Sequence, residues 1–255
     1  MIYKITDTGK ASEIFVGWEE TIIWSCLQGI MGRIYADSAD EPTAAAALLG
    51  DFIFLAGKPN AELVAFIVNQ GDSDFMIIVP QNDDWTNIVT QLCKDNCKIV
   101  TRYAIKKEPG IFDRDKLEKA AASLPDGYEL CMIDERLYNM CKSEEWSADL
   151  VAQFPDYEDY IRLGLGTVIL KNGFVVSGAS SYSRYRDGIE IEIDTQKDCR
   201  RKGLAYICGA KLILECLERN LYPSWDAQNK ASVALAEKLG YRYSHSYTAL
   251  EIWRR

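Results

Sequence analysis

The chain has 255 residues, of which 48% are hydrophobic and 26% charged, and its formal net charge is −9. This composition is typical of a globular protein and excludes a disordered or collagen-like chain. The excess of acids argues against nucleic-acid binding through a general basic surface, and it favours a cationic partner or a small cationic substrate.

The sequence has no stretch long enough for a membrane-spanning helix. Its longest runs without a charged residue, 21–32 and 172–183, have 12 residues each, whereas such a helix needs about 20. We therefore expect no membrane association, and the first residues lack the apolar region of a secretory signal. Eight scattered cysteines and a single histidine predict reduced thiols in a cytoplasmic protein and no metal site.

Turn signals divide the chain near its middle. Pro109-Gly110 and Pro125-Asp126-Gly127 are pairs typical of turns. We place a boundary between residues 110 and 127, which gives an N-terminal domain over 1–125 and a C-terminal domain over 126–255. No internal repeat is visible in the sequence.

Apolar patterns predict a mixed α/β fold for the N-terminal domain, whose role the sequence does not indicate. The expected elements are strands over 51–56, 63–68, 75–79 and 99–105 and a helix over 85–93. A short helix over 113–124, with Asp113 as its cap, falls at the boundary.

The C-terminal domain has a clearer order, and it predicts an α/β (α+β) fold with a mixed sheet flanked by helices. The expected strands are 128–133, 167–170, 174–180, 189–194 and 221–226, with a hairpin turn at 171–173 and a final hairpin over 241–252. The expected helices are 203–217, closed by Asn220, and 231–239, ended by Gly240. Residues 135–160 are expected to be mostly helical.

Residues 188–205, GIEIEIDTQKDCRRKGLA, contain the strongest chemical signal. A strand ends, a polar loop follows, and a helix begins near Gly203. The first N–H groups of a helix have no partner within it, and the helix dipole adds positive potential. The loop also carries a net charge of +3, from Lys197, Arg200, Arg201 and Lys202 against Asp198. This combination predicts a site for a diphosphate or a ribose phosphate.

The same segment carries a family resemblance. Arg200-Arg201-Lys202-Gly203-Leu204-Ala205 fits the R/Q-x-x-G-x-G/A motif of the Gcn5-related N-acetyltransferases (GNATs). Residues 225–232 and Leu239-Gly240-Tyr241 resemble the next strand, the asparagine-led helix and the Gly-aromatic pair of that superfamily. The resemblance covers roughly 126–255, and the longer architecture is similar to a bacterial subfamily that includes a zwittermicin A self-resistance acetyltransferase.

The resemblance implies acetyl-CoA as cosubstrate and no metal. The loop over 197–205 would bind the pyrophosphate through backbone amides, and the strand ending at Asp194 would splay from the strand beginning at Leu221 to admit the thioester. The pantetheine arm would add to the first strand and pass the start of the last helix. The implied cofactor-binding residues are Ile193, Asp194, Thr195, Lys197, Arg200, Arg201, Lys202, Gly203, Leu204, Ala205, Asn229 and Ser232. Asn229 has an alternative interpretation as a plain helix N-cap.

Two glutamates are candidates for the general base. Glu190 and Glu192 lie two residues apart on a predicted strand, so their side chains share one face, while the isoleucines between them take the other. In the family an acid on this strand often removes the proton of the amine, and we prefer Glu192 of the two. The same alternation is also typical of a solvated strand face.

The usual general acid is missing. The family often has a tyrosine seven residues after the asparagine, where this chain has Ala236. Tyr241, Tyr243 or Tyr247 could replace it, and we select Tyr241 as the candidate. The thiolate could also leave without a protein proton donor.

The leading hypothesis is therefore an N-acetyltransferase that acts by direct transfer on a primary amine of a small, cationic acceptor, for which an antibiotic is one candidate. Residues 134–159 carry eight acids and two bases and would attract such an acceptor. The alternative is a catalytically reduced module that keeps the fold and binds an acyl-CoA or a protein partner. The N-terminal domain could complete the acceptor pocket or form a homodimer interface.

Overall fold

The computed structural model describes residues 1–70 and 74–253, and the chain divides into two compact units. Unit 1 comprises Met1–Arg102 together with Ser246–Arg255, and unit 2 comprises Tyr103–His245. Among the described residues, no helix combines the length and apolar character that crossing a membrane requires.

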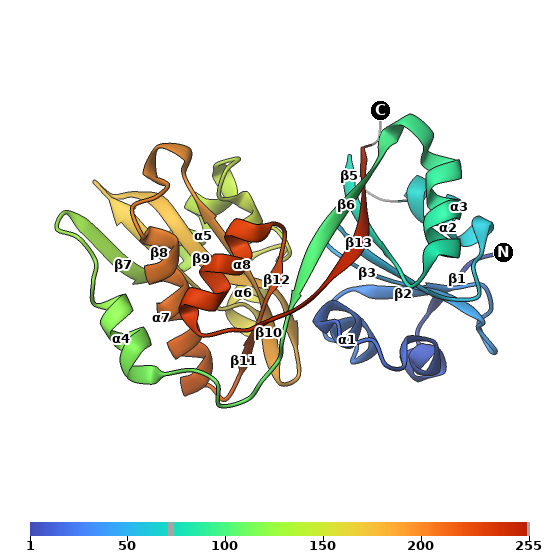
Figure 1. The fold of residues 1–255 in the computed structure, drawn as a ribbon, viewed down its shortest axis with the longest axis horizontal. Helices are drawn as coiled ribbons and strands as arrows, with labels where there is room; N and C mark the ends of the chain where they lie inside the picture. The colour runs from blue at the N-terminus through green and yellow to red at the C-terminus, as the bar shows by residue number, and fades with distance from the viewer. Residues whose placement is uncertain (71–73, 254–255) are drawn as a thin grey trace. The chain divides into compact units, whose positions relative to one another are not determined.

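Unit 1 is a sheet with helices inserted between its strands (Figure 1). Strands β1 to β4 pair antiparallel with their neighbours, and β4 pairs parallel with β5 across helix α2. The elements are β1 (Tyr3–Ile5), the 3₁₀ helix η1 (Thr8–Phe15), α1 (Thr21–Leu27), β2 (Arg33–Ala36), β3 (Ala44–Leu49), β4 (Phe52–Gly57), α2 (Ala61–Gln70), β5 (Phe75–Pro80), α3 (Asp83–Cys93), η2 (Lys94–Asn96) and β6 (Cys97–Ile105).

Unit 2 contains a five-stranded sheet in the order β7-β8-β9-β10-β11. Its elements are α4 (Arg114–Ala121), β7 (Tyr128–Met132), α5 (Glu135–Ser143), η3 (Ala148–Leu150), α6 (Tyr157–Leu163), β8 (Gly166–Lys171), β9 (Phe174–Tyr185), β10 (Gly188–Thr195), η4 (Lys197–Cys199), α7 (Leu204–Glu218), β11 (Tyr222–Ser224), β12 (Asp226–Ala227), α8 (Lys230–Leu239) and β13 (Tyr243–Trp253). Strands β7 to β10 pair antiparallel, and β10 pairs parallel with β11 across α7. The predicted mixed sheet flanked by helices is confirmed.

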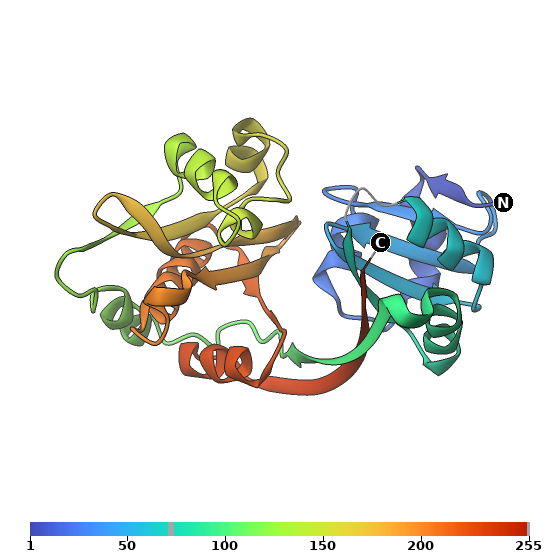
Figure 2. The same cartoon turned by 90° about the horizontal axis from the view of Figure 1, so that it is seen from above.

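Two strands carry the chain from one unit to the other, β6 on the way out and β13 on the way back (Figure 2). The sequence placed the division between residues 110 and 127, whereas the structure divides after Arg102. The reason is helix α4, whose Leu117 is fully buried in the core of unit 2 with side chains of α7. The Pro-Gly turn thus lies inside unit 2.

Local signals for turns and caps are confirmed. The hairpin turn contains Asn172 and Gly173, both with a positive φ, and Asn220 has the left-handed conformation expected after α7. Asp113 caps α4 by accepting a hydrogen bond from the Lys116 N–H, and α8 ends at Gly240, whose φ is 113°. These features depend on a few adjacent residues, which is why the sequence predicts them.

Three element predictions need correction. Residues 63–68, expected as a strand, lie in helix α2, because a continuous apolar run fits a buried helix as well as a buried strand. The expected hairpin over 241–252 is one long strand, β13, whose residues 250–253 pair with β5. The strand expected over 221–226 is divided into β11 and β12, which pair with β10 and β6 respectively. The region 135–160 is mostly helical as predicted, in α5, η3 and the start of α6.

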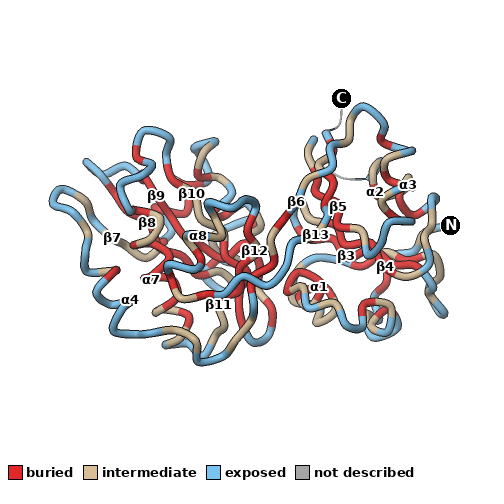
Figure 3. Tube along the Cα trace, viewed as in Figure 1, coloured by how far each residue is buried: buried red, intermediate tan, exposed pale blue. Residues whose placement is uncertain are grey.

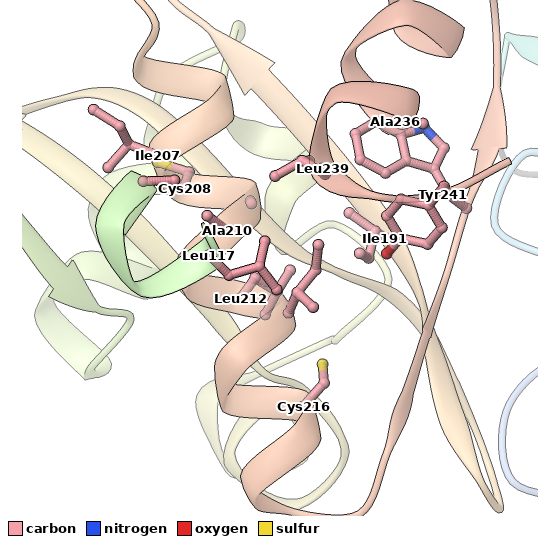
Figure 4. Close-up of a cluster of buried hydrophobic side chains, with 14 of the residues drawn as sticks. Leu117, Ile191, Ile207, Cys208, Ala210, Leu212, Cys216, Ala236, Leu239 and Tyr241 are labelled. Atoms are coloured by element: carbon pink, nitrogen blue, oxygen red, sulfur yellow. The ribbon is translucent and has the colours of Figure 1, made fainter. Parts of the chain in front are cut away.

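The core of unit 2 lies between the sheet and the helices α4, α7 and α8 (Figure 3). Ile189 and Ile191 of β10 belong to this core together with Ile207 and Ile213 of α7. Figure 4 shows Ile191 and Ile207 among these side chains. The other face of the sheet packs against η3, where Leu150 lies over Gly178 of β9. The even-numbered side chains of β10 therefore point toward the η3 side.

The two units share one order of elements, although no repeat is visible in the sequence. Unit 1 from β1 and unit 2 from β7 onward both have a strand, helical segments, three antiparallel strands, a helix, a parallel strand, a second helix and a long last strand, while α4 and the short β12 are additions of unit 2. Strand β4 of unit 1 thus corresponds to β10 of unit 2, α2 to α7, and β5 to β11. The two units thus repeat the order of elements and the strand pairing, and different sequences can form the same topology.

Candidate functional site

Strand β10 places a carboxylate in a buried, polar position. Glu190 is only 8% exposed, and the register sets it beside Ser183 of β9 and Ser224 of β11. Directly paired residues of neighbouring strands project from the same face of a sheet. Glu190 and the two serines therefore form one polar row across three strands, on the face opposite α7.

The hydrogen-bonded pairing of β10 and β11 ends at this row. The two strands match over three residue pairs, from Gly188 with Tyr222 to Glu190 with Ser224. The next strand, β12, pairs with β6 instead, and β9 bulges between the partners of Glu190 and Ile191. Among the described residues, Ile191–Thr195 thus has a strand partner only on its β9 side. This agrees with the divergence expected of these strands.

The loop after β10 turns sharply before α7 begins. Arg201 and Gly203 both have a positive φ, of 63° and 80°. A β-carbon on Gly203 would meet no atom within 4 Å, so the backbone there borders open space. The Arg200 Nε donates to the Thr195 carbonyl at 3.0 Å, which fixes the loop to the end of β10.

Helix α7 begins without a side-chain cap. Its N-cap is Gly203, which has no side chain to accept a backbone N–H. By contrast, α2, α3, α4, α5, α6 and α8 each have an Asn or Asp whose side chain accepts an N–H of the first turn. The first N–H groups of α7 are therefore available to an external acceptor, which the helix dipole makes favourable for an anion.

The four cations of the loop are exposed around this helix start. Lys197, Arg200, Arg201 and Lys202 all lie at the surface. The Arg200 guanidinium is 3.7 Å from the Asp194 carboxylate. Burial raises the pKa of Asp194, while the hydrogen bond from the Thr195 N–H and the charge of Arg200 act in the opposite direction. The helix start and its cations together can hold a polyanionic group.

Asn229 and Ser232 both have structural partners. The Asn229 side chain caps α8 by accepting the Ser232 N–H at 3.0 Å. The Ser232 hydroxyl in turn accepts the indole N–H of Trp225 at 3.1 Å. The interpretation of Asn229 as an N-cap is therefore confirmed, and it leaves the amide NH₂ of Asn229 as the group for any ligand contact.

The candidate acid Tyr241 lies in the core of unit 2 with Ala236 (Figure 4). Its hydroxyl donates to the Pro223 carbonyl at 2.7 Å, and its ring packs edge-on against Trp225 and Phe112. Burial raises the pKa of Tyr241 well above its usual value, and nearby Tyr222 adds to this effect. These contacts give Tyr241 a structural role that needs no catalysis.

The sequence reasoning did not single out Ser183, Ser224 and Tyr185. The Tyr185 and Ser224 hydroxyls lie 3.1 Å apart and buried, and burial raises the pKa of Tyr185. The Ser183 hydroxyl is fully buried and has no hydrogen-bond partner among the described residues. No spacing in the sequence could have grouped these side chains with Glu190, because they come from β9 and β11, which only the sheet brings beside β10.

The cationic loop before α7, the helix start without a side-chain cap and the short pairing of β10 with β11 agree with the family that the sequence matches. Residues 12–250 match the GNAT acetyltransferase family. The chain belongs to this family. It is therefore an acyltransferase of the N-acetyltransferase type.

Known proteins resemble this GNAT chain over nearly its whole length. An uncharacterized N-acetyltransferase of Bacillus subtilis, YdfB, is 30% identical over 247 residues, which cover 89% of this chain and 88% of YdfB. A GCN5-related N-acetyltransferase-like protein from Streptococcus suis is 47% identical, with a TM-score of 0.91 over 97% of this chain and 98% of its own. A tandem GNAT protein from the clavulanic acid biosynthesis pathway is only 9% identical but has a similar fold, with a TM-score of 0.56 over 99% and 98% of the two chains.

Replacing Tyr241 tests its structural role. We expect Tyr241→Phe to lower the free energy of unfolding by about 1–2 kcal/mol, because the buried Pro223 carbonyl loses its donor. Tyr243→Phe is the matched control, since the Tyr243 side chain is 39% exposed, and it should change stability little. Urea unfolding of both variants measures the difference. Equal stabilities would contradict the role.

Proposed function

We propose that this protein transfers an acetyl group directly from acetyl-CoA to a primary amine of a small, cationic acceptor. The observation that carries the proposal is the glycine-capped start of α7, beside four exposed cations and next to the stretch of β10 after Glu190, which among the described residues has a neighbouring strand only on its β9 side. This arrangement offers backbone donors for a diphosphate and a strand edge for an extended amide-containing chain, which are the two parts of coenzyme A that need binding.

The residues present fit this cosubstrate. The absence of a β-carbon at Gly203 lets a ligand approach the backbone closely, and the N–H groups of Leu204 and Ala205 follow in the first turn of α7. Residues Ile193, Asp194 and Thr195 would present their backbone to the pantetheine arm, with Asn229 and Ser232 across from them. Lys197, Arg200, Arg201 and Lys202 would neutralise the phosphates.

Glu190 is the stronger candidate for the general base. It is buried where the strands part, whereas Glu192 lies beyond this point and is more exposed. Bound acetyl-CoA would supply the activated acetyl thioester, and the base must remove a proton from the attacking amine. The buried Ser183 hydroxyl beside Glu190 could hold a water that relays this proton.

We assign no side chain as the proton donor for the departing thiolate. Ala236 occupies the position where the family often has its tyrosine, and the Tyr241 hydroxyl donates a hydrogen bond to the Pro223 carbonyl in the core. We infer that the thiolate leaves with solvent as its proton source. A thiolate is a tolerable leaving group near neutral pH because the thiol is itself weakly acidic.

Acidic side chains on the η3 side support a cationic acceptor. Of the eight acids between residues 134 and 159, Asp134 and Asp156 cap helices, and Asp159 pairs with Arg162. Asp149 belongs to η3, which packs against β10, and its charge acts on Asp194. Burial raises the pKa of Asp149, and a bound ammonium would stabilise its charged form.

An amine panel tests the proposed function. Purified full-length protein is incubated with acetyl-CoA and with monoamines, diamines, polyamines and amine-containing antibiotics such as zwittermicin A, while free thiol is followed over time. We expect turnover with cationic primary amines. Binding of acetyl-CoA without turnover on any amine would favour the catalytically reduced module, and absence of both would refute the proposal.

A charge placed at the start of α7 tests the diphosphate site. We expect Gly203→Asp to raise the KM for acetyl-CoA at least tenfold, because the carboxylate repels the phosphates and its β-carbon fills the approach to the backbone. Gly173→Asp is the matched control, since Gly173 has the same positive φ and equally open surroundings in a hairpin turn. Both substitutions carry the same backbone strain, so equal KM values would contradict the assignment.

Neutral replacements of the two glutamates test the base. We expect Glu190→Gln to lower kcat about 10²–10³-fold and Glu192→Gln to lower it less than tenfold. The loss in Glu190→Gln should be largest below the pKa of the acceptor amine and should shrink as the pH approaches that pKa, because the amine then needs no base. A pH–rate profile for each variant measures this. The reverse order of the two variants would make Glu192 the base.

A further inference from the structure

Unit 1 repeats the topology of unit 2 but differs from it at the positions that form the candidate site. We propose that unit 1 is a second GNAT-type unit closed to acyl-CoA, so that each chain binds one acyl-CoA, in unit 2. The number of ligands rests on the proposed function of unit 2. The closure of unit 1 is argued separately, from its own hydrogen bonds.

The connection between β4 and α2 is too short to form a diphosphate loop. It has three residues, Lys58, Pro59 and Asn60, where unit 2 has eight between β10 and α7. The Lys58 N–H donates to the Thr43 carbonyl at 2.8 Å, and Pro59 has no N–H. The Asn60 side chain accepts the Leu63 N–H at 3.0 Å, so the start of α2 already has an acceptor of its own.

The strands of unit 1 stay paired where those of unit 2 diverge. Pairing of β4 with β5 runs over four residues to Leu55 with Pro80. It is then extended, because the Gln81 N–H donates to the Leu55 carbonyl at 3.0 Å and the Gln81 side chain accepts the Gly57 N–H at 2.9 Å. The edge of β4 that faces β5 is thus hydrogen-bonded as far as Gly57, its last residue, and in the part of unit 1 that the structure describes β4 has no open edge for a pantetheine arm.

Trp85 of α3 contacts the same end of β4, at Gly57. Trp85 is fully buried, and its indole N–H donates to the Gly57 carbonyl at 3.1 Å. Both backbone polar groups of Gly57 therefore have partners within unit 1. A β-carbon at Gly57 would lie 2.2 Å from the Thr43 carbonyl oxygen, which shows how little space remains there.

Unit 1 also lacks the acidic face that would serve as a base. Strand β4 reads Phe52-Ile53-Phe54-Leu55-Ala56-Gly57, and its central four residues are buried. Apolar side chains on both faces of a strand are typical of a packing role. No carboxylate of β4 corresponds to Glu190 or Glu192.

The two connecting strands, β6 and β13, are each divided between the units. The end of β6 lies in unit 2, where Tyr103 and Ala104 pair antiparallel with Ala227 and Asp226 of β12. The end of β13 lies in unit 1, where it pairs antiparallel with β5. Strand β6 thus begins in unit 1 and ends in unit 2, and β13 begins in unit 2 and ends in unit 1.

Amide hydrogen exchange on the full-length protein tests the closure. Without ligand, we expect the amides of Gly57 and Gln81 to exchange at least tenfold more slowly than those of the β10 edge over 191–195. Addition of acetyl-CoA should slow exchange over 191–206 and leave 52–61 and 75–85 unchanged. Rapid exchange at Gly57 and Gln81 in the free protein, or new protection there with acetyl-CoA, would overturn the closure.

Calorimetric titration with acetyl-CoA tests the number of sites. We expect one equivalent per chain, and we expect Lys202→Glu to raise Kd at least tenfold while Lys58→Glu, the equivalent charge reversal in unit 1, changes it less than twofold. Two equivalents, or a tenfold effect of Lys58→Glu, would overturn the proposal. If no acetyl-CoA binds, the function proposed for unit 2 fails, while exchange at Gly57 and Gln81 still decides whether unit 1 is closed.

Discussion

The parallel pairing of β10 and β11 stops after three residue pairs, and the rest of the site depends on this point. A strand edge without a neighbour has N–H and C=O groups that need partners, so it can bind an extended ligand through its backbone. The same point places Glu190 at the end of the paired region and leads β10 directly into the loop before α7. The candidate base, the strand edge and the start of α7 therefore follow one another along the chain, beginning where the β10–β11 pairing ends.

The two units show that the length of one connection can change what a shared topology does. Eight residues between β10 and α7 leave room for a loop with two left-handed residues and four cations, whereas three residues between β4 and α2 do not. In unit 1 the Gln81 side chain accepts the Gly57 N–H, and the Trp85 indole N–H donates to the Gly57 carbonyl. These backbone groups therefore already have the hydrogen bonds that a ligand would otherwise have to make.

Charge in this protein acts locally. The net charge of −9 does not describe the start of α7, because the four cations of residues 197–202 lie together there. The acids between 134 and 159 divide into helix caps, an ion pair and a remainder, and Asp149 of that remainder lies on the η3 side with the even-numbered residues of β10. The two regions would thus favour opposite ends of the reaction, the phosphates of the cosubstrate and the ammonium of the acceptor.

The sequence by itself determined the features that a few adjacent residues control. These are the turn at Asn172-Gly173, the caps Asp113 and Asn229, the alternation of β10 and the loop motif that identifies the family. Only the tertiary structure decided the helical state of 63–68, the burial of Tyr241, the row of Ser183, Glu190 and Ser224, and the repeat hidden in unit 1. The physical reason is that these depend on which strands lie side by side, and hydrogen-bonded pairing between distant segments leaves no local pattern in the sequence.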